Sequence, residues 1–127
     1  MQDNHLYEYA VIRVVPRVER EEFLNIGIIL FCKKAKFIKV LSHIDDDKIQ
    51  TLSNDFDIEQ LHCNVIALKK IAAGDKDGGP IGEMDIPSRF RWLTAIRSSA
   101  IQSSRPHSGL CEDLEKTIQR LFEELVL

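Results

Sequence analysis

A nearly unbroken apolar run, FLNIGIILFC, occupies residues 23–32. The run is much shorter than the roughly 20 residues that a membrane-spanning helix needs. Its β-branched and aromatic side chains favour a strand, and the lack of regular polar alternation is typical of a strand covered on both faces. Gly27 interrupts the run and indicates a bulge or a close approach of another backbone. We therefore predict a central strand at residues 23–32.

The segments on either side of this run also have the pattern of strands. Residues 7–15 alternate, so that one face carries Tyr7, Tyr9, Val11, Arg13 and Val15, and the other carries Glu8, Ala10, Ile12 and Val14. Pro16 has no backbone N–H and is expected to end this strand. Residues 37–42 follow a lysine-rich turn. The three segments together predict an antiparallel meander.

The rest of the chain has mainly helical patterns. Helices are expected at residues 46–54, 58–72 and 87–97 and in the last segment, with Asp45–Asp47 and Asp57 as N-terminal caps and Gly74 as a C-terminal stop. Residues 98–104 are expected to return to the sheet as an edge strand. This order predicts an α+β fold, with helices against one face of an antiparallel sheet. The length predicts a single domain, residues 1–127.

Charge and cysteine content exclude several classes of protein. The net charge is −3, which disfavours bulk binding to nucleic acid or to anionic lipid. The three cysteines are widely spaced and form no zinc-type pair. The first 15 residues contain charged side chains and no continuous apolar segment, so no signal peptide is expected. We predict a cytoplasmic protein with no cofactor and no membrane association.

One segment differs in charge from the rest of the chain. Residues 86–111 contain four arginines and no lysine, aspartate or glutamate. Arginine offers a rigid fork that fits phosphate or carboxylate groups, and serine hydroxyls can complete an anion pocket. The candidate residues here are Arg91, Trp92, Arg97, Ser98, Gln102 and His107. The alternative is structural: the arginines then pair with acidic side chains elsewhere in the fold.

A second candidate group lies at the entry to the apolar run. Arg20, Glu22 and Asn25 can orient a ligand or transfer a proton, and regular alternation places Asn25 and Gly27 on one strand face. The alternative is a buried, hydrogen-bonded asparagine with a structural role. Arg13 belongs with the arginine segment if residues 7–15 lie beside residues 97–105.

Two other patterns do not predict a functional site. His43 precedes three aspartates, but these fit a helix cap and no further ligand is spaced to complete a metal shell. We therefore predict no metal site. His107 and Cys111 suggest a thiol–imidazole pair, yet the acidic Glu112 and Asp113 oppose thiolate formation and no orienting residue is evident.

Two sequence blocks resemble a known family. They are YAVIRVVPRVEREEFLNIGIIL, residues 9–30, and RFRWLTAIRSSAIQSS, which begins at Arg89 and continues to HSGL. Both are similar to a bacterial family of unknown function, number 3037. The resemblance implies no established activity. Its members are similar in genome context to accessory proteins encoded beside kinases that resemble the HipA toxin, which implies a kinase-like protein partner.

These observations leave three hypotheses. The first is an accessory protein-interaction domain of the bacterial cytoplasm with a HipA-like kinase as its partner. The second is a binding or catalytic domain for a nucleotide or phosphodiester, in which Arg13, Arg91 and Arg97 converge on an open cleft. The third is a homo-oligomer that buries a sheet edge. The sequence does not decide whether the protein is an enzyme.

Overall fold

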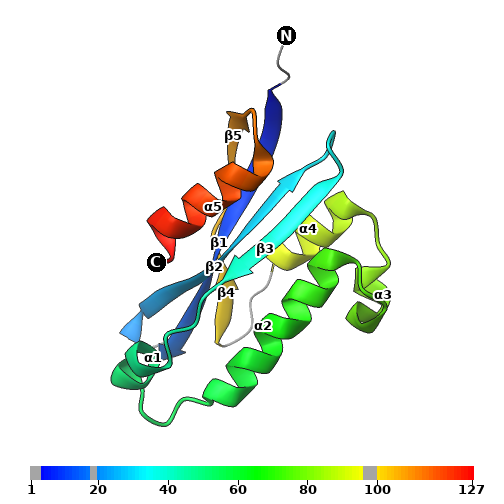
Figure 1. Ribbon diagram of the computed structural model, residues 1–127. Helices are drawn as coiled ribbons and strands as arrows, with labels where there is room; N and C mark the ends of the chain where they lie inside the picture. Colours follow the sequence, from blue (N-terminus) through cyan, green and yellow to red (C-terminus); the bar gives the residue numbers. More distant parts are fainter. Residues whose placement is uncertain (1–3, 18–19, 96–99) are drawn as a thin grey trace.

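The computed structural model describes residues 4–17, 20–95 and 100–127 (Figure 1). Its sheet contains β1 (His5–Arg17), β2 (Glu22–Cys32), β3 (Phe37–Ser42), β4 (Ile101–Ser103) and β5 (His107–Cys111). The helices are α1 (Asp46–Leu52), α2 (Ile58–Ala73), α3 (Gly79–Gly82), α4 (Ile86–Thr94) and α5 (Leu114–Leu125). A short 3-10 turn, Lys76–Gly78, precedes α3. The predicted α+β class is confirmed.

The first three strands pair as the sequence pattern predicts. The order is β3-β2-β1, all antiparallel, and both β4 and β5 pair with the other edge of β1. Within the residues that the structure describes, no helix is long and apolar enough to cross a membrane.

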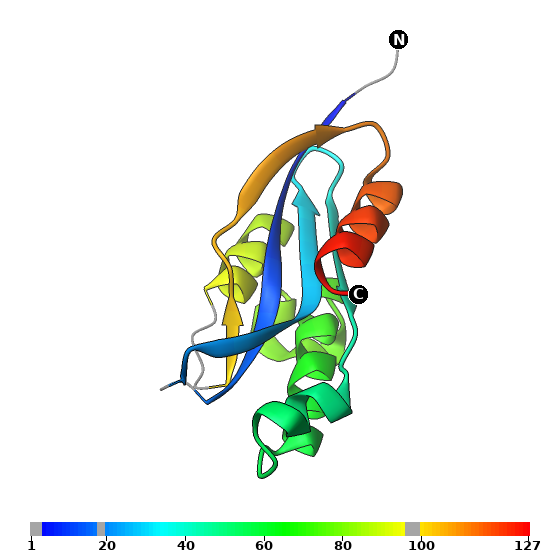
Figure 2. The same cartoon turned by 90° about the vertical axis from the view of Figure 1, so that its left-hand side faces the viewer.

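Helices cover both faces of the sheet, so the prediction of helices on one face is wrong. One core packs α2 and α4 against Ala10, Ile12 and Val14 of β1. The second packs α5 against Tyr7 and Val11, which alternate with the first set. Figures 1 and 2 show α5 on the side of the sheet opposite α2 and α4. The predicted alternation of β1 is therefore confirmed, and its second apolar face accommodates α5.

Pro16 lies within β1 and does not end it. The register between β1 and β2 shifts between Val14 and Arg17, so the ladder is already interrupted where Pro16 has no N–H to donate. Val15, its neighbour, still donates its N–H to Ala100 O at 2.7 Å. The strand can therefore continue through the proline.

Gly27 marks both a bulge and a close backbone approach, as its position in the apolar run predicts. Ile12 pairs with Gly27 and Arg13 pairs with Asn25, which leaves Ile26 as the extra residue of β2. A Cβ at Gly27 would lie 3.0 Å from the carbonyl oxygen of Leu41 on β3. Because of this extra residue, the β2 side chains before the bulge point to the opposite face from the one that regular alternation would give them.

The helix ends match their predicted caps. Asp45 accepts a hydrogen bond from the N–H of Lys48 at 3.1 Å, and Asp57 accepts one from the N–H of Gln60 at 3.0 Å. Gly74 ends α2 in the left-handed region, with φ of 70°. The local signals therefore place the ends of these helices well.

Strand β5 has no counterpart in the sequence-based prediction. It pairs Tyr7 with Gly109, and the tyrosine ring lies over the glycine. A Cβ on Gly109 would lie 2.6 Å from Cζ of Tyr7, which is itself buried. The glycine thus gives the ring the space it occupies between β1 and β5.

We expect Gly109→Ala to lower the free energy of unfolding by about 1–3 kcal/mol, because the buried ring of Tyr7 must move. Ser108→Ala, on an exposed neighbouring residue, is the control and should change stability by less than about 0.5 kcal/mol. Denaturant unfolding of both variants measures the difference. Equal stability of the two would show that the ring does not depend on this space.

Candidate functional site

Five sequence-predicted residues and one further residue, Phe23, lie on β1, β2 and β4 or just before β2, towards the lower end of the sheet in Figure 1. We call this group the basal surface and define it by Arg13, Arg20, Glu22, Phe23, Asn25 and Gln102. Arg13 on β1 is paired with Asn25 of β2 on one side and with Gln102 of β4 on the other. Directly opposed residues share a face, so these three side chains lie on the side of the sheet that α5 covers further up. The expected approach of Arg13 to Gln102 is therefore confirmed.

Among the described residues, Arg13 has an aromatic neighbour and no acidic partner. Its guanidinium carbon lies 4.6 Å from the centroid of the Phe23 ring, which is within the range of a cation–π contact. Phe23 is 49% exposed. The Arg13 Nε is buried without an acceptor, and none of the ion pairs in the described part of the chain includes this arginine. A positive charge and an exposed ring therefore lie together on the basal surface.

Asn25 ties the sheet to the end of α5. Its Nδ2 donates to Leu125 O at 2.9 Å, in the last turn of a helix, where carbonyls lack helical partners. This bond fixes the orientation of the amide, and the buried Oδ1 has no donor. The bulge turns Gly27 to the face of Ile12, opposite Asn25, so the prediction that Asn25 and Gly27 share a face is wrong.

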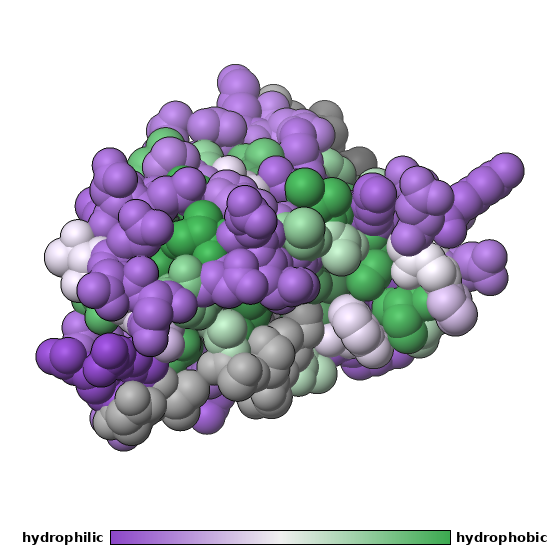
Figure 3. Space-filling model, turned by 90° about the horizontal axis from the view of Figure 1, so that it is seen from below, coloured by the Kyte–Doolittle hydropathy of each residue, from purple (hydrophilic) through white to green (hydrophobic). Residues whose placement is uncertain are grey.

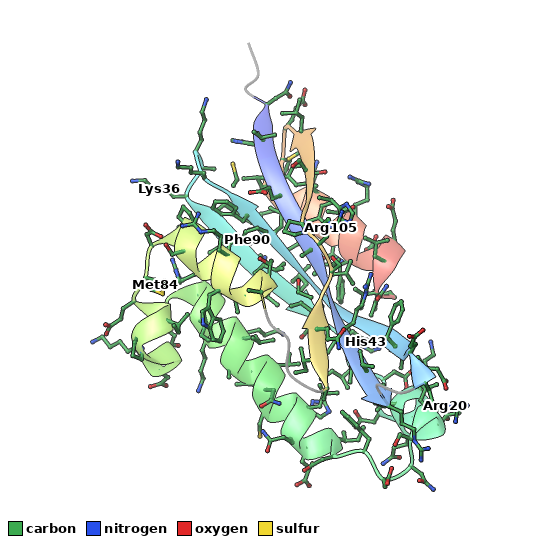
Figure 4. The ribbon with its side chains drawn as sticks, turned by 180° about the vertical axis from the view of Figure 1, so that it is seen from behind. Arg20, Lys36, His43, Met84, Phe90 and Arg105 are labelled. Carbon is green, nitrogen blue, oxygen red and sulfur yellow. The ribbon has the colours of Figure 1, made fainter. Side chains whose placement is uncertain are left out.

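Arg20 and Glu22 form an ion pair at the edge of the basal surface. The Arg20 Nε lies 2.6 Å from Glu22 Oε1, and the side chains are 58% and 37% exposed. Figure 4 shows Arg20 at the end of the molecule opposite Lys36. Because both side chains are exposed, the two charges are accessible to a partner. Exposed pairs of this kind contribute only about 0–1 kcal/mol to stability.

The arginines of α4 lie on the other side of the sheet. Arg91 and Trp92 are exposed there, and Nη2 of Arg91 donates to Ser88 Oγ at 3.3 Å. Hydrogen bonding by the side chain of Ser88, and then by its N–H, holds the pKa of Asp85 below its usual range, with smaller contributions from Arg91 and Arg89. The structure does not bring Arg91 or Trp92 to Arg13.

Arg89 has a structural position. Its Nη1 donates to Ile71 O at 3.2 Å and to Ala72 O at 3.0 Å, and the residue is buried. These carbonyls lie at the end of α2, which carries the negative end of the helix dipole. The described arginines of this segment are thus divided between one buried helix cap, Arg89, and the exposed Arg91 and Arg105.

The other predicted residues are Arg97, Ser98 and His107. Arg97 and Ser98 lie outside the described residues. His107 of β5 pairs with Tyr9 of β1, and their ring centroids are 5.3 Å apart. Cys111 is at the far end of the same strand, about 13 Å away at 3.3 Å per residue, so a thiol–imidazole pair does not form.

A cleft of about 220 Å³ adjoins the basal surface and has no counterpart in the sequence-based predictions. Its lining residues are Leu24, Asn25, Ile26, His43, Asp45, Lys48, Val126 and Leu127. A second hollow, of about 280 Å³, shares His43 with this cleft and is also lined by His62 and Lys69. The Nε2 of His62 forms a hydrogen bond with Asp46 Oδ1 at 3.0 Å. In residues 4–17, 20–95 and 100–127, no three metal-binding side chains gather at one point.

Sequence reasoning missed Phe23 and Lys48 for identifiable reasons. Phe23 looks like the first residue of a buried strand, yet it is half exposed because the end of β2 extends beyond α5. Lys48 carries no signal in the sequence, since its place in the cleft depends on how α1 packs beside β2.

Comparison with known proteins gives one result. No curated protein and no solved structure matches this chain significantly. One family, described as "Protein of unknown function (DUF3037)", matches residues 9–126. Because this match covers nearly the whole chain and includes both resembling blocks, the protein belongs to the DUF3037 family.

Proposed function

We propose that this protein is an accessory protein-interaction domain, which binds its partner through the basal surface. The observation that carries the proposal is the contact of Arg13 with the half-exposed ring of Phe23, where no acidic side chain of the described residues pairs with the arginine. Arginine and aromatic residues are enriched at the centres of protein interfaces, where they supply most of the binding energy. The partner is a protein surface with a carboxylate for Arg13 beside an apolar side chain for Phe23.

The mixed character of this end of the molecule supports a reversible interaction. Figure 3 shows separate hydrophobic patches framed by hydrophilic residues. Obligate interfaces are usually more continuously apolar, whereas non-obligate ones are about as polar as the rest of the surface. The Arg20–Glu22 pair at the edge adds charges of both signs, which favour one orientation of the partner.

A kinase resembling the HipA toxin is the first partner to test. Two points support this choice. Similar accessory proteins are encoded beside such kinases, and a basic, aromatic surface favours a partner surface that carries acidic groups. A partner of this type would place the complex in the bacterial cytoplasm. The binding of one folded protein to another requires no cofactor.

The anion-binding alternative has weaker support. It requires several arginines around one opening, and Arg91 lies on the opposite side of the sheet from Arg13. Glu22, which is partly exposed, also presents a carboxylate rather than a donor to an incoming anion. A phosphate at this surface would meet one unpaired guanidinium and little else among the residues described.

Co-expression of the protein with its chromosomal neighbours, including a HipA-like kinase, tests the proposal. We expect one neighbour to co-elute with it in a stoichiometric complex on size exclusion. Failure of every neighbour to co-elute, together with a salt-sensitive rise in melting temperature on adding nucleotides, would contradict the proposal and favour the anion site.

A further inference from the structure

Strand β2 continues past the end of its neighbour β3. The β3 ladder covers only Gly27–Cys32 of β2, and the last contact beyond it is the bond from the N–H of His43 to Ile26 O at 2.8 Å. Among the described residues, no strand pairs with residues 22–25 on that side (Figure 1). A strand edge without a neighbour is a template for another extended chain.

The backbone groups of Asn25 point to this open edge. Val11 O accepts from Ser104 N at 2.8 Å and Val15 N donates to Ala100 O at 2.7 Å, so both valines direct their backbone groups to the β4 side. Arg13, two residues from each, does the same by the period of a strand. Its partner Asn25 therefore belongs to a non-hydrogen-bonded pair, and its N–H and C=O point away from β1.

The cleft of about 220 Å³ lies along the same edge and is lined in part by polar and charged residues. Asn25 lines it, and the Oδ1 of this residue is buried without a donor. Lys48 also lines it and takes part in none of the ion pairs that the described chain contains. The cleft thus offers one strand edge and one positive charge.

We propose that this cleft binds an extended segment of the partner protein, which adds to β2 as a further strand. The segment supplies N–H and C=O groups to Asn25 and an acidic side chain to Lys48. A bare phosphate fits less well, since the carboxylate of Asp45, which also lines the cleft, would repel it. Strand addition of this kind gives affinity through the main chain and specificity through alternate side chains. The inference rests on the proposed function and names the form of the partner.

Two variants at one position provide the test. Asn25→Pro and Asn25→Ala both remove the side chain that bonds Leu125, but only proline removes the outward N–H. Proline is tolerated at a strand edge when its N–H side faces solvent, so both variants should fold alike by circular dichroism. The probe is a phage-displayed library of random eight-residue peptides, selected on the full chain and then measured by fluorescence polarisation.

We expect the selected peptides to contain an acidic residue and to bind Asn25→Pro about tenfold or more weakly than Asn25→Ala. Lys48→Glu should weaken binding by a similar factor, while Lys33→Glu, at the other end of β2, should leave it unchanged. The amide signal of Asn25 should shift on binding. Equal affinity for the proline and alanine variants, or a library that yields no binder, would overturn the inference.

A second copy of this chain is the other occupant that a strand edge can take. A wild-type dimer that becomes monomeric in Asn25→Pro would assign the cleft to that copy and overturn the inference. Failure of the inference is separable from failure of the proposed function. If a co-eluting partner is lost in Arg13→Glu but binds Asn25→Pro and Asn25→Ala equally, the basal surface stands and strand addition does not.

Discussion

Arg89→Met is expected to lower the free energy of unfolding by about 2–4 kcal/mol. The substitution removes a buried, charged hydrogen-bond donor and leaves two backbone carbonyls without it. The guanidinium bonds Ile71 O and Ala72 O, and it packs against Gly74, where a Cβ would lie 2.6 Å from Nη1. Methionine fills similar space without donating. The loss should therefore separate α4 from the end of α2.

Arg91→Met is the matched control, on the same helix and exposed. Its hydrogen bond to Ser88 Oγ is long, at 3.3 Å, so the free energy of unfolding should change by less than about 0.5 kcal/mol. Urea unfolding followed by circular dichroism measures both. Similar stabilities for the two variants would mean that the buried guanidinium does not hold α2 and α4 together.

Arg13→Glu is expected to weaken the complex with the protein partner by about 100-fold or more. The change replaces the positive charge of Arg13 with a negative one, facing the partner's carboxylate, and it removes the contact with Phe23. Losses of this size are typical of central arginine and aromatic residues, where about 2 kcal/mol or more is lost on truncation. Titration calorimetry with the co-eluting partner provides the affinity.

Arg91→Glu makes the same charge reversal on the opposite face of the sheet. It should leave the affinity within about twofold, because rim and remote charges affect binding little at physiological salt. If Arg91→Glu weakens binding as much as Arg13→Glu, the partner contacts α4, or overall charge dominates, and the basal surface is not the binding site. Phe23→Ala, which changes no charge, should weaken binding by at least about tenfold.

Local patterns predicted most of the fold. The central strand, the meander, the helix caps at Asp45 and Asp57 and the stop at Gly74 all follow from side-chain types that act over a few residues. Strand β5 was missed because Gly109 weakens its strand pattern, and its stability depends on the ring of Tyr7, about 100 residues away in sequence. The second face of the sheet was missed because the pattern of α5 shows that it packs, but not on which side.

The candidate site was predicted in part. Sequence reasoning placed Arg13 beside Gln102, which depends only on two strands meeting. It grouped Arg91 with them because the arginines are close in the sequence, whereas α4 lies on the other face. The cleft depends on where β3 ends and where α1 and the last residues pack beside β2, and no local pattern encodes that arrangement.

Nuclear magnetic resonance of the labelled chain, free and bound to its co-eluting partner, tests the central proposal most directly. The side-chain Nε–H of Arg13, the side-chain amide of Gln102 and the ring of Phe23 report on the basal surface without relying on any mutation. We expect these signals to show the largest shifts, with those of Arg91 and Trp92 unchanged. Shifts confined to α4, with the signals of Arg13, Gln102 and Phe23 unmoved, would contradict the proposed binding surface.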